Sequence, residues 1–104
     1  MKIQSDNKLP LVKRERNQAQ ICFNEIEITV DENVKYEYDS VRVAFPYTYS
    51  SIVSAIITDK YPNDVMQAIV NNHLEGGSEE HEQEYLEMQA WRQTAKKVAR
   101  QITA

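Results

Sequence analysis

Glycine and proline are scarce in this sequence, which has two glycines and three prolines in 104 residues. The two glycines are adjacent, at Gly76 and Gly77. A phosphate-binding loop and a dinucleotide fingerprint both need several glycines at fixed spacings, so the sequence excludes them. It also excludes a nucleophile elbow, which needs glycines on both sides of a serine. We therefore expect no cofactor and no enzyme site of these kinds.

Cysteine is equally scarce, because Cys22 is the only one. A single thiol cannot form an intrachain disulfide, and a reducing compartment is the simpler expectation. Cys22 lies in an apolar stretch, and neither histidine is near it in the sequence. We interpret it as a small buried residue rather than a catalytic thiol.

Long apolar runs are also missing. The most apolar window, from Ile52 to Ile57, is far too short to cross a bilayer. The first residues turn polar at once and lack the apolar segment of a secretory signal. We therefore expect a cytoplasmic protein with no membrane partner.

The net charge of −4 is unevenly distributed. Both ends of the chain are basic, whereas no lysine or arginine occurs from Tyr61 to Trp91. A generally acidic surface argues against nucleic-acid binding, whose affinity comes mainly from neutralising phosphates. The basic ends leave one alternative open, in which nucleic acid is contacted by Lys13, Arg14, Arg16, Lys96, Lys97 and Arg100.

The remaining composition is that of a globular chain, with 41% hydrophobic and 27% charged residues. A chain of this length can build one hydrophobic core. Residues 1–19 are polar, and we expect them to form a partly mobile N-terminal arm. Residues 20–104 are expected to form a single α+β domain.

Alternating apolar and polar residues predict strands in the first half of the domain. The alternation runs from Ile26 to Val30 and again from Val34 to Tyr38, with turn-forming residues between them, which predicts a hairpin. At Asp39–Ser40 the alternation slips by one residue, so the apolar residues from Val41 to Phe45 would face the other side. A β-bulge or a second tight turn would explain the slip. We favour a turn, which gives an antiparallel meander of about three strands.

Helical spacing replaces the alternation after Pro46. A first helix is predicted from about Tyr49 to Lys60, with Thr48 or Ser50 as its N-cap. A second helix starts near Pro62 and ends at the glycine pair. A third, long helix follows Ser78, and its acidic start and basic end complement the helix dipole. The expected fold class is therefore α+β, with a small antiparallel β-meander followed by three α-helices, the last one long.

Two histidines and a run of glutamates are the only residues that suggest metal or acid–base chemistry. His73 and His81 lie on opposite sides of the glycine pair, in different helices, and so lack the spacing of a helical zinc pair. The glutamates from Glu79 to Glu84 share one exposed turn, whereas paired catalytic acids need unlike environments. We expect no catalytic, cofactor-binding or metal-binding residues, and an enzyme or metal protein is the least favoured interpretation.

Tyrosine is abundant, with six residues, and one tryptophan accompanies it. Tyrosine and tryptophan are enriched at interfaces because they bury a large area and keep a polar group. They can equally well line the junction between the sheet and the helices. The candidate protein-interface residues are Tyr47, Tyr49, Tyr85 and Trp91. The apolar stripe of the third helix could also pair with its own copy in a symmetric dimer.

Five short runs between Tyr38 and Arg100 carry a family resemblance. They are Tyr38-Asp39-Ser40-Val41-Arg42-Val43, Thr48-Tyr49-Ser50, Asp59-Lys60-Tyr61-Pro62-Asn63-Asp64-Val65-Met66-Gln67-Ala68-Ile69, Glu87-Met88-Gln89-Ala90-Trp91-Arg92 and Ala95-Lys96-Lys97-Val98-Ala99. With these runs the chain resembles small prophage and mobile-element proteins of gut anaerobes, a family of unknown function. The resemblance implies a phage-borne setting, in which small acidic proteins often serve virion assembly. It transfers no functional residue.

Taken together, these features favour a non-enzymatic protein-interaction module or phage-assembly accessory. Its partner would be another protein or a second copy of the chain. The alternative is a nucleic-acid-associated regulator that uses the two basic ends.

Overall fold

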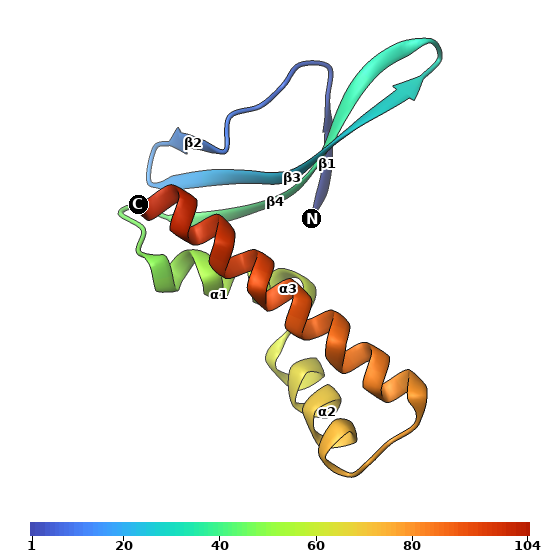
Figure 1. The fold of residues 1–104 in the computed structure, drawn as a ribbon. Helices are drawn as coiled ribbons and strands as arrows, with labels where there is room; N and C mark the ends of the chain where they lie inside the picture. Colours follow the sequence, from blue (N-terminus) through green and yellow to red (C-terminus); the bar gives the residue numbers. More distant parts are fainter.

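A computed structural model describes residues 1–104 (Figure 1). Four strands form one antiparallel sheet in the order β1-β4-β3-β2, with α1 and the C-terminal half of α3 beneath one face. The elements are β1 (Lys2–Ser5), β2 (Val12–Glu15), β3 (Gln18–Val30), β4 (Asn33–Ala44), α1 (Tyr49–Lys60), α2 (Asn63–Leu74) and α3 (Glu79–Thr103). The predicted α+β class is confirmed, with four strands rather than about three.

Strands β3 and β4 form one long hairpin. The turn lies at Asp31 and Glu32, whose φ angles of 50° and 67° suit a tight hairpin turn. The second turn predicted at Asp39–Ser40 is wrong, because β4 continues without interruption and Ser40 pairs with Cys22. The register shift instead lies in β3, between Phe23 and Ile26.

The slip in the apolar pattern has a different physical cause. Alternate residues of a strand point to opposite faces, so Val41 lies on the face toward the helices and Tyr38 on the other. Both are buried. The chain between β1 and β2 covers the second face, where the Leu9 backbone N–H donates to the Tyr38 hydroxyl at 2.8 Å. The pattern slips because β4 is covered on different faces by different segments.

We expected residues 1–19 to form an N-terminal arm outside the domain. They instead supply both edge strands of the sheet. Ile3 pairs with Tyr38 of β4, and Val12 pairs with Ile21 of β3. Edge strands keep one side in water and tolerate polar side chains, so their sequences lack a clear alternation. The mobility of this segment stays a prediction.

The main core lies between the sheet and the two helices beneath it. The sheet contributes Ala19, Ile21, Phe23, Val41 and Val43, α1 contributes Ile52, Ile56 and Ile57, and α3 contributes Ala95, Val98 and Ala99. The apolar stripe of α3 is therefore buried within the chain. A symmetric dimer through this helix stays a prediction.

The predicted helix boundaries are confirmed where caps define them. Thr48 accepts a hydrogen bond from the Ser51 N–H in a capping box, and Ser78 accepts one from the His81 N–H. Helix α2 packs against the first half of α3, away from the sheet, and we call these two segments (residues 63–74 and 79–88) the helical arm (Figure 1). None of the three helices combines the length and the apolar character needed to cross a membrane.

Candidate functional site

The outer half of the β3–β4 hairpin projects beyond the helices (Figure 1). We call residues 26–35 the β-arm. Strand β2 pairs with β3 only as far as Ile21, and β1 pairs with β4 only from Tyr36 to Asp39, so neither edge of the β-arm has a neighbouring strand. Three aliphatic side chains are exposed on it, namely Ile26 (49%), Val30 (38%) and Val34 (47%). A soluble protein rarely leaves both strand edges and apolar side chains uncovered in one place.

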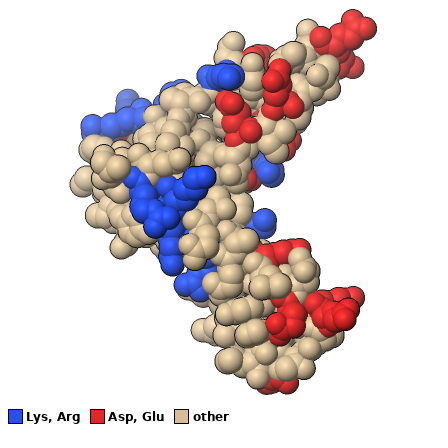
Figure 2. Space-filling model, in the orientation of Figure 1, with Lys and Arg blue, Asp and Glu red and all other residues tan.

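The β-arm is also acidic. Glu27, Asp31 and Glu32 are exposed on it, and its only basic residue is Lys35. The Lys35 amine lies 3.8 Å from the Asp6 carboxylate, which neutralises part of its charge. Acidic side chains therefore cover the tip of the β-arm (Figure 2).

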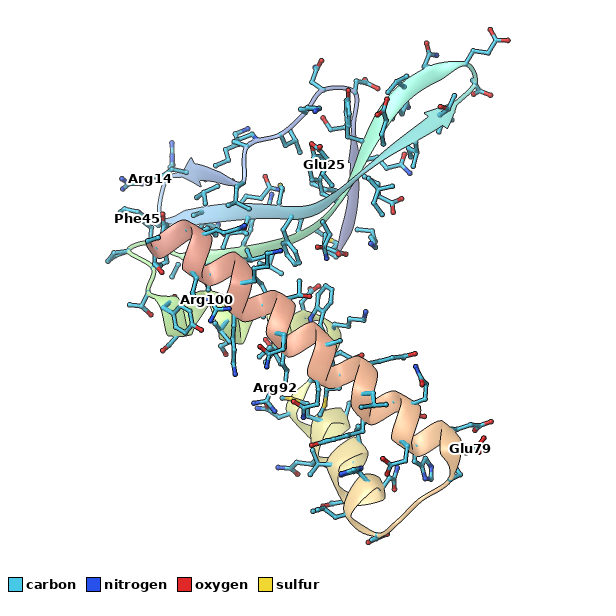
Figure 3. The ribbon with its side chains drawn as sticks, in the orientation of Figure 1. Arg14, Glu25, Phe45, Glu79, Arg92 and Arg100 are labelled. Carbon is cyan, nitrogen blue, oxygen red and sulfur yellow. The ribbon has the colours of Figure 1, made fainter.

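The opposite end of the same hairpin is basic and aromatic. The guanidinium carbon of Arg14 lies 3.5 Å from the centre of the Phe45 ring, and Phe45 meets Tyr47 edge to face with ring centres 5.7 Å apart. Phe45 and Tyr49 are 37% and 38% exposed. Figure 3 places Arg100, near the end of α3, at this same end of the molecule. We call Arg14, Phe45, Tyr47, Tyr49 and Arg100 the basic–aromatic end.

The two groups of basic residues predicted to contact nucleic acid come to the same end of the fold. Lys13 and Arg14 lie on β2, and Arg16 lies in the turn after it. The other group lies on α3. Its residues Lys96, Lys97 and Arg100 are in the C-terminal half of that helix, which packs beneath the sheet. Figure 2 shows basic side chains over this part of the molecule and acidic ones on the two arms. Contact with nucleic acid stays a prediction.

The four predicted interface residues do not share one surface. Tyr47 and Tyr49 belong to the basic–aromatic end. Tyr85 stacks on His73 in the helical arm, with ring centres 3.8 Å apart. The Trp91 indole N–H donates to the Ile56 carbonyl at 3.0 Å, and its ring centre lies 5.7 Å from that of Phe23. Trp91 thus has a structural role in the core, and its part in an interface stays a prediction.

A pocket of about 390 Å³ lies between the β1–β2 connection, the bulge of β3 and α3. At its wall the Tyr38 hydroxyl donates to the Glu25 carboxylate at 2.6 Å and accepts from Leu9. Loss of solvation raises the pKa of Tyr38, and the hydrogen bond to Glu25 raises it further. Burial also raises the pKa of the Cys22 thiol in the same wall. Both shifts favour the neutral forms, so neither group is prepared as a nucleophile at neutral pH.

The two histidines, for which we predict no metal-binding role, lie in different surroundings. His73 Nδ1 lies 2.7 Å from the Glu82 carboxylate, whereas His81 Nδ1 is buried without a hydrogen-bond partner. No group of three or more His, Cys, Asp or Glu side chains is placed to share a metal ion. The pair of His73 and Glu82 joins α2 to α3 and so stabilises the helical arm.

Sequence reasoning missed Phe45 and the exposed aliphatic residues of the β-arm. Phe45 was expected to be the last apolar residue of a strand, and nothing in the local pattern places Arg14 over its ring. Ile26 and Val30 showed the alternation of a half-buried strand, which does not reveal whether the apolar face is covered. Comparison with protein-family models, curated proteins and solved structures finds no match to this chain.

Proposed function

We propose that this protein is a non-catalytic interaction module that uses its β-arm to bind a protein partner, either another protein or a second copy of the chain. The observation that carries the proposal is the exposure of Ile26, Val30 and Val34 on an arm that projects beyond the helices. Covering one such side chain is favourable by about 1 to 2 kcal/mol. A partner seated on the β-arm would also supply hydrogen-bonding groups for its free strand edges.

The assembly role is the more specific part of the proposal. The resemblance to prophage-encoded proteins supports a setting in which accessory proteins hold larger components of the virion together. An arm that projects from a folded body suits such work, because it reaches a neighbour while the core stays intact. The proposed role is therefore that of a phage-assembly accessory.

Site-specific photo-crosslinking in cells that produce the virion tests this function. A photoreactive residue at Ile28, in the middle of the β-arm, is compared with one at Gln83, which is exposed on the helical arm. We expect a defined protein adduct from position 28 and none of the same mass from position 83. Absence of any adduct at position 28, or equal adducts at both positions, would reject the proposal.

A second candidate function is nucleic-acid association, which the gathering of basic residues at one end of the molecule favours. It predicts that log affinity falls linearly with log salt concentration, by about 0.9 for each phosphate neutralised. Neutralising Lys96, Lys97 and Arg100 to glutamine should abolish binding, whereas neutralising Lys8 and Lys35 should not. Binding that is absent or insensitive to salt would exclude this candidate.

A further inference from the structure

We infer that the partner of the β-arm is a second copy of this chain, with the β-arm of one copy docked on the basic–aromatic end of the other. This inference rests on the proposed function and names its partner. It goes beyond that function because it assigns both halves of the contact to residues of one sequence.

The two surfaces are complementary in both polarity and charge. The β-arm presents the aliphatic side chains of Ile26 and Val30, and the basic–aromatic end presents the exposed rings of Phe45 and Tyr49. Aromatic and aliphatic side chains of this kind form the apolar centres of protein interfaces.

Charge complementarity surrounds this apolar centre. Asp31 and Glu32 occupy the tip of the β-arm, with Glu27 beside them on β3. Arg14 lies over the exposed Phe45 ring, and Arg100 lies at the same end of the molecule (Figure 3). Neither guanidinium has a carboxylate partner within its own chain. Potentials of opposite sign speed association and fix the orientation in which two surfaces meet.

The contact cannot form within one molecule. The β-arm and the basic–aromatic end lie at opposite ends of the β3–β4 hairpin, and β3 has 13 residues. At about 3.3 Å per residue, a strand of that length separates its ends by about 40 Å. Only a neighbouring copy can bring the acidic tip to Arg14, so the pairing joins unlike surfaces of two chains.

The helical arm is the main competitor as a docking element, since its tip is also acidic (Figure 2). Its exposed leucines, Leu74 and Leu86, come from two different helices. The β-arm instead combines Ile26 and Val30 in one short strand segment with unpaired backbone edges. These features favour the β-arm, and the helical arm provides a matched control.

Sedimentation velocity over a wide range of protein concentration, at low and at high salt, tests the inference on nuclease-treated full-length protein. The arm variant is Glu27→Lys with Glu32→Lys, and the end variant is Arg14→Glu with Arg100→Glu. The control variant, Glu80→Lys with Glu84→Lys, changes the same amount of charge on the helical arm. Circular dichroism confirms that each variant is folded.

We expect wild-type protein to self-associate, and to do so less at high salt. The arm and end variants should each associate at least about tenfold more weakly, which corresponds to about 1.4 kcal/mol. An equimolar mixture of the two should recover association, because the lysines on the β-arm of the arm variant then meet the glutamates at the basic–aromatic end of the end variant. The control variant should match the wild type.

Several outcomes would overturn the inference. They are a wild-type protein that stays monomeric at every concentration, arm and end variants that associate like the wild type, and a mixture that recovers nothing. A monomer that binds duplex DNA through Arg14 and Arg100 would assign the basic–aromatic end to nucleic acid. A monomer whose position 28 still crosslinks to another protein would overturn self-association alone and leave the proposed function standing.

Discussion

The guanidinium carbon of Arg14 lies 3.5 Å from the centre of the Phe45 ring. Arg14 belongs to the edge strand β2, and Phe45 begins the connection between β4 and α1. The Phe45 N–H also donates to the Asn17 carbonyl at 2.8 Å, just after β2. The two contacts tie an edge strand to the segment that leads into the helices, and they present an exposed ring beside a positive charge.

Replacement of Arg14 should have a small but measurable effect on folding. A cation over an exposed aromatic ring contributes about 0.5 to 1 kcal/mol, so we expect Arg14→Ala to lower the free energy of unfolding by that amount. Urea denaturation measures the change. Arg16→Ala, in the exposed turn that follows, is the control and should have less effect. Equal losses from both substitutions would show that the ring contact does not stabilise the fold.

Tyr38→Phe should be more damaging, because the hydroxyl of Tyr38 makes two hydrogen bonds. Its removal leaves the Leu9 N–H and the Glu25 carboxylate without this partner. We expect a loss of about 1 to 3 kcal/mol in the free energy of unfolding. The same substitution at Tyr36, which is half-buried and whose hydroxyl makes no hydrogen bond within the chain, is the matched control. An unchanged stability in Tyr38→Phe would contradict the proposed tie between the β1–β2 connection and β4.

Trp91→Phe tests whether Trp91 acts in the core or in an interface. The substitution removes the hydrogen bond from the indole to the Ile56 carbonyl and part of the contact with Phe23. We expect unfolding at lower urea concentration, with a loss of about 1 to 3 kcal/mol. If Trp91 instead served only a partner, the substitution would weaken binding and leave the unfolding curve of the free protein in place.

The helices could be predicted from the sequence because their signals are local. Thr48 and Ser78 are capping residues beside apolar positions three and four residues apart, and the glycine pair stops α2. The strands were harder, since a strand is completed by segments distant in sequence. The sequence pattern predicts a turn inside β4, because it does not show that Tyr38 is covered by Leu9, a residue far away in the sequence.

The candidate surfaces could be predicted only in part. Residue type alone predicts an interface role for Tyr47 and Tyr49 and a nucleic-acid contact for Arg14 and Arg100. Their assembly at one end of the molecule depends on β2 and α3 both lying against β3. Exposure of the β-arm could not be predicted either. It results from the short lengths of β1 and β2 and from the end of the helical layer, which are properties of the whole fold.

The glycine pair makes a prediction about the tip of the helical arm. A Cβ at position 77 would clash with the His81 ring and lie 2.9 Å from the Asn72 carbonyl oxygen, so Gly77→Ala forces a local shift. We expect a loss of about 1 to 3 kcal/mol in the free energy of unfolding. Adding His81→Ala should recover part of this loss, because the carbonyl contact remains.

Gly76→Ala provides the comparison for this site. Gly76 has open space around its Cα but a φ of +70°, so alanine there costs about 1 kcal/mol of backbone strain. His81→Ala should relieve nothing in that background. Equal recovery by His81→Ala in both backgrounds would contradict the steric explanation.

Stability should decline at alkaline pH. Burial raises the pKa of Cys22, Tyr38 and Tyr61 above their ordinary values of 9.0 for the thiol and 10.0 for the phenols, and Glu87 and Glu84 raise that of Tyr61 further. The folded chain therefore holds these protons more tightly than the unfolded chain does. The resulting stability is fully present below the unfolded-state values and is lost as pH rises through the folded-state values.

We therefore expect the free energy of unfolding, measured with urea under reducing conditions, to fall as pH rises above about 9, the ordinary thiol value. Cys22→Ala should remove the earliest part of the decline, and Tyr61→Phe should reduce the later part. Tyr49→Phe, at an exposed position, is the control and should leave the slope unchanged. A free energy of unfolding that stays level or rises between pH 9 and pH 11 would contradict this prediction. It would mean that these three groups are as well solvated in the folded chain as in the unfolded one, and the burial of Tyr38 beneath Leu9 would then be wrong.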